Sequence, residues 1–186
     1  MGSLRTRIPF TILALLASAL ADSPSPSGAE DAPEKPAARS LQRALESLTL
    51  PYLDGRDVKL SSLLGRGPVL LDFWAIWCKP CLLGLPELEK LHADLAPRGL
   101  QVVAINEDGP RNAAKVKPFL KSKGYTLAVL LDLNREAQTR LQAIALPTTL
   151  LLDAAGVVVH TSFGYRPGEY DALREKIEPL LRKQDE

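Results

Sequence analysis

The feature that most constrains the fold is an apolar run at residues 69–75 that leads almost directly into a cysteine pair, Cys78 and Cys81. An apolar run of this length is typical of a strand that is buried on both faces of a sheet. Beyond the pair, leucines recur at intervals of three and four residues, which predicts a long amphipathic helix. The cysteines are therefore expected where a central strand ends and a helix begins.

These two cysteines are the only ones in the chain. The start of a helix carries about half a positive charge and several unpaired backbone N–H groups, so it favours a thiolate at Cys78. A fall in the pKa of Cys78 from about 8.5 to about 7 would raise its thiolate fraction at neutral pH from roughly 3% to roughly half. The position of the pair therefore favours redox chemistry.

A structural disulfide and a metal site are the alternatives. A disulfide that closes a ring of about four residues removes only about 2 kcal/mol from the unfolded ensemble, against about 4.7 kcal/mol for a loop of about a hundred. A closed zinc site needs four ligands, and His92 and His160, the chain's two histidines, lack ligand spacing to the cysteines. We therefore expect a redox-active Cys78–Cys81 disulfide, with no metal and no other cofactor.

The N-terminus has the pattern of an export signal. Two arginines precede the apolar stretch 8–21, which ends on the small-x-small sequence Ala19-Leu20-Ala21. We predict a signal peptide over residues 1–21, cleaved before Asp22. The alternative is an uncleaved membrane anchor, but the stretch is shorter than the roughly 20 apolar residues that span a bilayer. After cleavage we expect no membrane span.

Composition separates a linker from the folded part. Residues 22–39 are rich in Pro, Ser and Ala and too polar to form a core, whereas residues 40–186 are expected to form one domain. Loss of Arg5 and Arg7 with the signal leaves 21 of the 23 basic residues against 22 acidic ones. This balance gives no electrostatic footprint for nucleic acid or an anionic membrane surface.

The rest of the domain alternates strands and helices. Besides the strand at 69–75 and the helix after it, the pattern predicts a helix at 40–48, a hairpin within 48–60 around Asp54-Gly55, a strand at 100–106, a helix at 113–123 interrupted by Pro118, a strand at 126–131, a helix at 135–143, a hairpin over 150–161 and a final helix striped from Tyr170 to Leu180. Such an order is typical of a three-layer α/β domain with a mixed sheet.

Residues 73–81, Phe-Trp-Ala-Ile-Trp-Cys-Lys-Pro-Cys, together with Pro86 and the later Leu146-Pro147-Thr148-Thr149, resemble the thioredoxin superfamily. More narrowly, the chain resembles the exported TlpA/ResA-like thiol-disulfide oxidoreductases over roughly residues 48–181. The resemblance implies a thioredoxin-like three-layer α/β/α fold with a mixed central sheet and an N-terminal β-hairpin. It also implies a strand and helix inserted between residues 100 and 123, and a bacterial periplasmic location.

The same resemblance assigns roles to the two thiols. Cys78 becomes an exposed nucleophile that attacks a partner disulfide, and Cys81 becomes a buried resolving thiol that displaces the partner. Protein disulfides are then the substrates, with the haem-attachment cysteines of an apocytochrome or the cysteines of a copper-site protein as examples. A membrane thiol donor is a candidate source of electrons.

Further site residues follow from the motif. Trp77 is expected to cover the pair and contact the partner, with a core tryptophan as the alternative, and Lys79 either favours the thiolate or simply faces solvent. Pro80 suits the first turn of a helix. Pro147 resembles the superfamily's cis-proline facing the dithiol, with Leu146 as a partner contact, although propensity alone predicts a trans bond there.

Acidic residues raise separate questions. Asp72 lies within the apolar strand, where burial should raise its pKa, and it matches the aspartate of classical thioredoxins that relays a proton to the resolving thiol, here Cys81. The alternative is a hydrogen-bonded aspartate at the edge of the sheet. Gly84 stands where ResA-like proteins commonly have a glutamate. Residues 106–110 are expected to be a solvated acidic connection rather than a cation site.

Two other functions use the same residues. Two thiolates at this spacing could hold Cu(I) as a metallochaperone does. A peroxiredoxin-like peroxidase shares the fold, but it requires a threonine two or three residues before its attacking cysteine, where this chain has Ala75 and Ile76.

Overall fold

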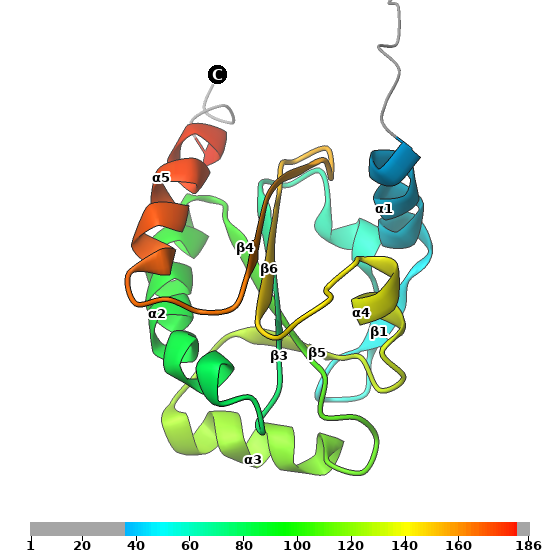
Figure 1. Ribbon diagram of the computed structural model, residues 1–186, viewed down its shortest axis with the longest axis vertical. Helices are drawn as coiled ribbons and strands as arrows, with labels where there is room; N and C mark the ends of the chain where they lie inside the picture. Colours follow the sequence, from blue (N-terminus) through cyan, green and yellow to red (C-terminus); the bar gives the residue numbers. More distant parts are fainter. Residues whose placement is uncertain (1–35, 182–186) are drawn as a thin grey trace, which may run out of the picture. The chain divides into compact units, whose positions relative to one another are not determined.

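The computed structural model describes residues 36–181, so the expected signal peptide and most of the expected linker lie outside the described residues. A five-stranded mixed sheet forms the centre, in the order β5-β4-β3-β6-β7 (Figure 1). Its strands are β3 (Val69–Trp74), β4 (Gln101–Asn106), β5 (Ala128–Leu131), β6 (Thr148–Leu152) and β7 (Val158–Phe163). β3, β4 and β5 run parallel, β6 pairs antiparallel with β3 and β7 pairs antiparallel with β6, which confirms the mixed α/β prediction.

Helices cover both faces of this sheet. α2 (Lys79–Leu95) and α5 (Glu169–Leu181) lie together on one face, and α1 (Pro36–Ser47) and α4 (Glu136–Arg140) lie together on the other (Figure 1). α3 (Ala113–Lys123) belongs to the α2 side, because Val116 and Leu120 share a core cluster with that helix. No helix in residues 36–181 is both long enough and apolar enough to cross a membrane.

β3 is the central strand, and all six of its residues are buried. Side chains alternate across a strand, so Leu70 and Trp74 enter the core beneath α2 and α5, while Leu71 and Phe73 enter the core beneath α1 and α4. Burial on both faces explains why this segment reads as a continuous apolar run rather than as an alternating one.

The N-terminal hairpin is confirmed as β1 (Thr49–Pro51) paired antiparallel with β2 (Asp57–Lys59). Gly55, in the turn between them, has φ 85°, a conformation that glycine adopts readily. Two short 3₁₀ helices, η1 (Leu60–Leu63) and η2 (Ala96–Arg98), complete the fold. β4 and α3 lie between residues 100 and 123, where the family resemblance implied an inserted strand and helix.

Two details differ from the sequence-based expectations. α1 begins at Pro36, before the expected start at residue 40, because proline is well suited to the first turn of a helix. The expected interruption of α3 at Pro118 is wrong, since the helix runs through it. Pro118 has no N–H, so the carbonyl of Ala114, one turn earlier, lacks its helical hydrogen bond. Both residues are exposed, so this carbonyl remains in contact with solvent.

Candidate active site

Cys78 and Cys81 form a disulfide at the start of α2, with an S–S distance of 2.04 Å and a Cα–Cα distance of 5.3 Å. Cys78 is the N-cap residue of α2, and its Sγ accepts a hydrogen bond from the Cys81 backbone N–H at 3.3 Å. Pro80 occupies the first turn, where its missing N–H leaves no bond unmade. The expected junction between a buried strand and a helix is therefore confirmed, with the pair at a helix end that favours a thiolate.

The disulfide borders a cavity of about 430 Å³. One wall consists of residues 77–80, and the other consists of Arg135, Gln138 and residues 144–146. Cys78 belongs to this lining and Cys81 does not, yet their exposures are similar, at 5% and 3%. The expectation of an exposed Cys78 is thus wrong for the disulfide form, because the cavity walls cover nearly all of the residue.

Leu146-Pro147 is a cis peptide bond, as the family resemblance implied and as propensity alone did not. The Pro147 carbonyl accepts a hydrogen bond from the Gly164 N–H at 2.8 Å, and Thr148 Oγ1 donates to the Ala145 carbonyl at 2.6 Å. Within residues 36–181 the backbone N–H and C=O of Leu146 make no hydrogen bond. Leu146, whose backbone is unpaired, thus lines the same cavity as Cys78.

Trp77 is 59% exposed, so the core-tryptophan alternative is wrong; the buried tryptophan is Trp74. Lys79 and Pro80 are also exposed, and both line the cavity. The structure thus brings together five of the residues singled out in the sequence around one cavity: Trp77, Cys78, Lys79, Pro80 and Leu146.

Asp72 is 2% exposed and lies in the middle strand of the sheet, so the sheet-edge alternative is wrong. Strand alternation directs it toward the α2 and α5 side, the core layer that contains Cys81. Thr149 Oγ1 donates to its Oδ1 at 2.8 Å and the Tyr170 hydroxyl donates to the same oxygen at 3.2 Å. Burial raises the pKa of Asp72 to about 7, against the lowering effect of these two hydrogen bonds.

The sequence analysis missed both partners of Asp72. Thr149 is its cross-strand neighbour in the antiparallel β3–β6 register, and a correct pairing of those two strands would have identified it. Tyr170 belonged to the predicted apolar stripe of the last helix, where its hydroxyl carried no visible signal.

Gly84 packs directly against two tyrosine rings. A Cβ atom built at this position would lie 2.9 Å from Cδ2 of Tyr165 and 3.2 Å from Cε2 of Tyr170. Tyr165 is held in place because its hydroxyl donates to Glu87 Oε1 at 2.6 Å. The space beside this turn of α2 is therefore filled by aromatic rings and not by a glutamate side chain. The buried carboxyl group on this side of the sheet is that of Asp72, on β3.

The expected solvated connection at residues 106–110 is also wrong, since Asn106, Glu107 and Asp108 are buried. Asp108 Oδ2 accepts hydrogen bonds from the Ile76 N–H at 2.9 Å and from Asn106 Nδ2 at 2.7 Å. The chain thus folds back beneath the loop that precedes Cys78 and holds it. Sequence patterns gave no indication of this contact, because it joins the ends of two adjacent parallel strands.

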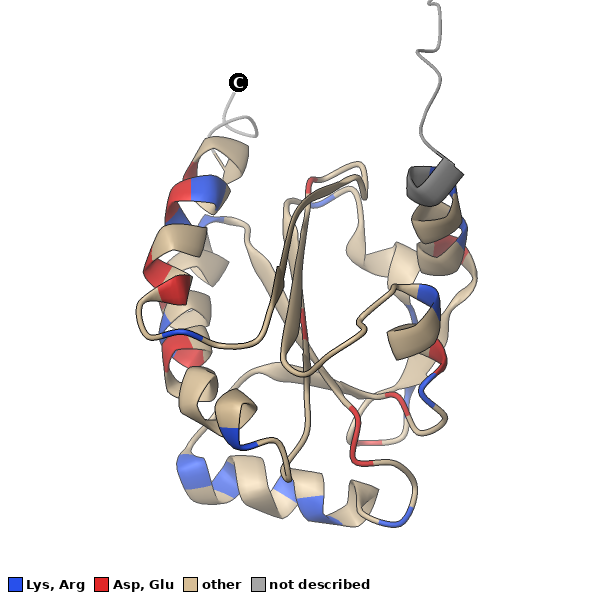
Figure 2. Ribbon diagram, viewed as in Figure 1, with Lys and Arg blue, Asp and Glu red and all other residues tan. Residues whose placement is uncertain are grey.

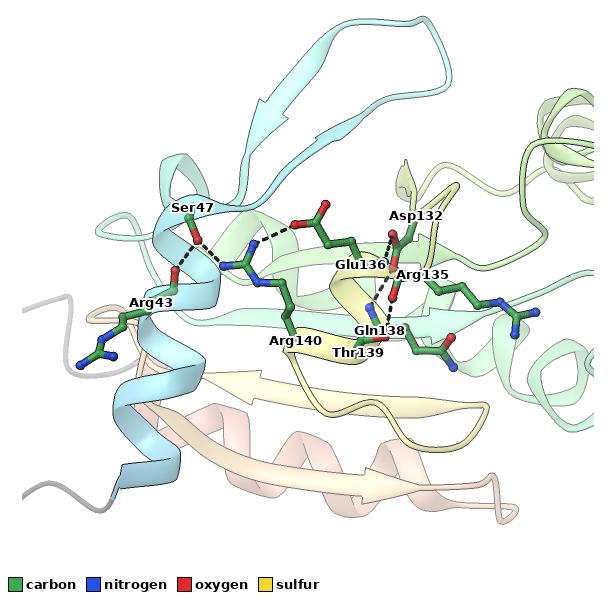
Figure 3. Close-up of polar contacts among 8 residues, drawn as sticks. All are labelled: Arg43, Ser47, Asp132, Arg135, Glu136, Gln138, Thr139 and Arg140. Carbon is green, nitrogen blue, oxygen red and sulfur yellow. Dashed lines mark hydrogen bonds and ion pairs between the residues drawn. The ribbon is translucent and has the colours of Figure 1, made fainter.

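Glu107 adjoins Asp132, on the side of the sheet that faces α4. Burial, and secondarily the charge of Asp132, raise the pKa of Glu107 to about 9, so its carboxyl group is neutral at pH 7. Asp132 caps α4 by accepting the Glu136 N–H at Oδ1 and the Gln138 N–H at Oδ2, both at 2.8 Å (Figure 3). This cap fixes the turn in which Arg135 adopts φ 57°.

The α4 segment presents two different sides. Arg140 pairs with Glu136 of its own helix and points toward α1, where it contacts the Ser47 hydroxyl (Figure 3). Arg135 extends away from these three residues (Figure 3). Arg135 and Gln138 line the cavity beside Cys78. Among residues 36–181, no group of three or more His, Cys, Asp or Glu side chains is arranged to hold a metal ion.

Comparison with known proteins agrees with this geometry. The sequence profile of the AhpC/TSA family matches residues 41–161. The chain is 31% identical to the thiol-disulfide oxidoreductase ResA of Halalkalibacterium halodurans over 147 residues, which cover 77% of this chain and 80% of the relative. It is 30% identical to ResA of Bacillus thuringiensis over 131 residues, 70% of each chain.

Solved structures show the same fold. A candidate thiol:disulfide interchange protein DsbE from Chlorobium tepidum superposes with a TM-score of 0.66 at 33% identity, covering 72% of this chain and 92% of that one. The exposed lipoprotein thioredoxin of Streptococcus pneumoniae superposes with a TM-score of 0.61 at 28% identity, covering 72% and 98%. The chain therefore belongs to the AhpC/TSA family, has a thioredoxin-like fold and is a ResA-like thiol-disulfide oxidoreductase with a Cys-x-x-Cys disulfide.

Proposed function

We propose that this protein reduces disulfides in partner proteins through a cycle of Cys78 and Cys81. The observation that carries the proposal is the placement of the disulfide. It caps the first turn of α2 and borders a cavity whose opposite wall includes Leu146, next to cis-Pro147. A nucleophile and a surface for the partner chain thus share one opening.

The cycle consists of two thiol–disulfide exchanges. The Cys78 thiolate attacks one sulfur of the partner disulfide, forms a mixed disulfide and releases the other partner sulfur as a thiolate, which takes up a proton. The Cys81 thiolate then attacks the sulfur of Cys78, forms the Cys78–Cys81 disulfide and releases the second partner thiol. Two electrons pass to the partner, and a thiol donor must return two electrons to the pair.

Asp72 is proposed to accept the proton of Cys81 before the second exchange. Its pKa of about 7 makes it a carboxylate in about half of the molecules at neutral pH, so it can both take and return a proton. It lies in the same core layer as Cys81. The hydrogen bonds from Thr149 and Tyr170 to Oδ1 orient the carboxyl group.

The partner chain is proposed to lie along Leu146 in extended form. The unpaired N–H and C=O of Leu146 can bond it as a neighbouring strand would, and the exposed face of Trp77 adds apolar contact. Lys79 and Pro80 complete the contact surface around Cys78.

Location and organisation follow as part of the same proposal. A signal peptide at residues 1–21 and a linker at 22–39 would deliver the domain to the bacterial periplasm. There it would reduce cysteines of an apocytochrome or a copper-site protein and be reloaded by a membrane thiol donor. The Streptococcus pneumoniae relative is itself an exposed lipoprotein, which supports a location outside the cytoplasm.

A trapping experiment tests the cycle. Reduced Cys81→Ser protein, mixed with insulin as a disulfide substrate, should accumulate a mixed disulfide through Cys78 because the resolving thiol is gone. Cys78→Ser should form none, and the wild-type protein should turn over insulin with dithiothreitol as the electron source. Full insulin turnover by Cys78→Ser would overturn the proposal.

The same preparations distinguish the alternatives. Tight Cu(I) binding without insulin reduction would indicate a metallochaperone, and peroxide consumption without insulin reduction would indicate a peroxidase. We expect insulin reduction to be the dominant activity.

A further inference from the structure

The cavity beside Cys78 is lined by two cations and no carboxylate. Lys79 and Arg135 are both exposed and both line this cavity, from the start of α2 and from the turn before α4. Within residues 36–181, neither side chain makes an ion pair or a hydrogen bond. Two unpaired positive charges therefore flank the opening through which a partner sulfur would reach Cys78.

Among the described residues, no carboxyl group near this end of the sheet forms an ion pair with Lys79 or Arg135. Asp108 and Asp132 both accept backbone N–H groups, from Ile76 in one case and from α4 in the other. Glu107 is 1% exposed, and its pKa of about 9 leaves it uncharged at pH 7. The positive charge of Arg135 lowers the pKa of Glu107 slightly against the effect of burial, and the Arg135 side chain, without an ion pair, lines the cavity.

A positively charged segment follows β4. Residues 109–131 contain no Asp or Glu, and they contain five basic residues: Arg111, Lys115, Lys117, Lys121 and Lys123. Four of the five are lysines of α3, a helix that carries blue and no red in Figure 2. α3 packs through Phe119 on Trp74, the last residue of the strand that leads to the dithiol, with 5.8 Å between ring centroids. Such a field raises the association rate of a negatively charged partner.

We infer that the partner segment this site takes carries carboxylate side chains beside its disulfide cysteine, so that Arg135 and Lys79 select acidic substrates. The inference rests on the proposed function and names the substrate class. Two exposed apolar residues also line the cavity, Trp77 at 59% exposure and Ile144 at 81%. They would contact the apolar part of the partner segment whether or not that segment is charged. Arg135 is therefore a specificity-determining residue in this account.

The test uses three synthetic disulfide-linked peptide dimers that differ only in the residues flanking cysteine, which are Glu, Gln or Lys. The rate constant for oxidation of the reduced full-length protein is measured by stopped-flow fluorescence for each peptide. Comparing protein variants on the same peptides cancels the intrinsic reactivity of each disulfide. Arg135→Gln should lower the Glu-to-Gln rate ratio by about fivefold, the upper range for one partly exposed charge pair.

Arg66→Gln is the matched control, because Arg66 is an exposed cation just before β3, at the opposite end of that strand from the dithiol. It should leave the ratio unchanged, and Arg135→Glu should make the Lys peptide the preferred substrate. The effect of Arg135→Gln should shrink at about 0.5 M salt, where exposed charges are screened. Equal ratios in the wild type and Arg135→Gln, with all peptides reduced, would overturn the inference alone. Failure to reduce any peptide would overturn the proposed function instead.

Discussion

At the scale of single residues, the buried carboxyl group of Asp72 links the protonation state of the core to the stability of the fold, and its part in thiol exchange is proposed. Its carboxyl group is buried and its pKa is raised from 3.8 to about 7 by that burial. At pH values between 3.8 and about 7, Asp72 is ionised in the unfolded chain but remains protonated in the folded protein. Ionisation therefore lowers the free energy of unfolding progressively as the pH rises, and the loss is complete above about pH 7.

The first prediction is that Asp72→Asn removes this pH dependence. A shift of about three pKa units corresponds to about 4 kcal/mol, which the wild-type protein should lose, relative to the variant, between pH 4 and pH 8. Urea unfolding of the oxidised proteins across that range measures it. Parallel stability curves for the two proteins would show that Asp72 ionises normally in the folded state.

The second prediction concerns Tyr170, which we propose as a positioning residue for Asp72. Its hydroxyl donates to the carboxylate and so stabilises the charged form, which lowers the pKa of Asp72. Tyr170→Phe should therefore move the pH midpoint for resolution of the mixed disulfide to higher pH. Tyr165→Phe is the control, because the Tyr165 hydroxyl bonds Glu87 instead. Superimposable pH profiles for Tyr170→Phe and the wild type would contradict this role.

At the scale of elements, α2 packs closely against the segment before α5, and Gly84 of α2 is the residue that allows this close approach. Alanine normally favours a helix over glycine by up to about 1 kcal/mol. Here the added Cβ would come within 2.9 Å of the Tyr165 ring, and overpacking of this kind costs roughly 1–3 kcal/mol. The third prediction is that Gly84→Ala lowers the free energy of unfolding, by about 1 kcal/mol.

Removing the obstructing ring should reverse that sign. In a Tyr165→Ala background the closest contact is gone, so Gly84→Ala should become neutral or stabilising. Denaturant unfolding of the four proteins forms the double-mutant cycle. Stabilisation by Gly84→Ala in the wild-type background would mean that α2 and the tyrosine rings are less tightly packed than described.

The loop between β3 and α2 depends on Asp108. Asp108→Ala leaves the half-buried N–H of Ile76 without its acceptor, at a cost of about 1 kcal/mol. The fourth prediction is that this variant is both less stable and slower in reducing insulin, because the loop before Cys78 is no longer fixed. Asp153→Ala removes a similar pair of bonds, to the N–H groups of Ala155 and Val157, in the β6–β7 turn. It should lower stability without slowing insulin reduction, and equal activities for the two variants would contradict a specific role for Asp108.

At the scale of the whole molecule, local sequence patterns were sufficient to predict the strands and helices. They were insufficient to predict the contacts between residues far apart in the sequence. The apolar run at β3, the leucine spacing of α2 and the turn at Asp54-Gly55 are local, and each predicted its element correctly. The bonds of Asp72 to Thr149 and Tyr170 join residues 77 and 98 positions apart, and the Asp108 bond to Ile76 spans 32. No local periodicity encodes such contacts, which depend on strand order and register.

The burial of residues 106–108 has the same origin. A short acidic segment after a strand normally indicates a solvated connection, but here it lies against the end of the parallel neighbour β3, where the Glu107 N–H bonds the Trp74 carbonyl. The cis bond at Pro147 was accessible only through the family motif, because propensity favours the trans form.

The fold as a whole brings the start of α2, the end of β3 and the loop at Pro147 to one place, and the central claim is that this place stabilises a thiolate at Cys78. The most direct test is the thiol pKa of Cys78 in the Cys81→Ala variant, measured from the ultraviolet absorbance of the thiolate as the pH is varied. The account predicts a pKa of about 7. A value of about 8.5, that of free cysteine, would contradict it.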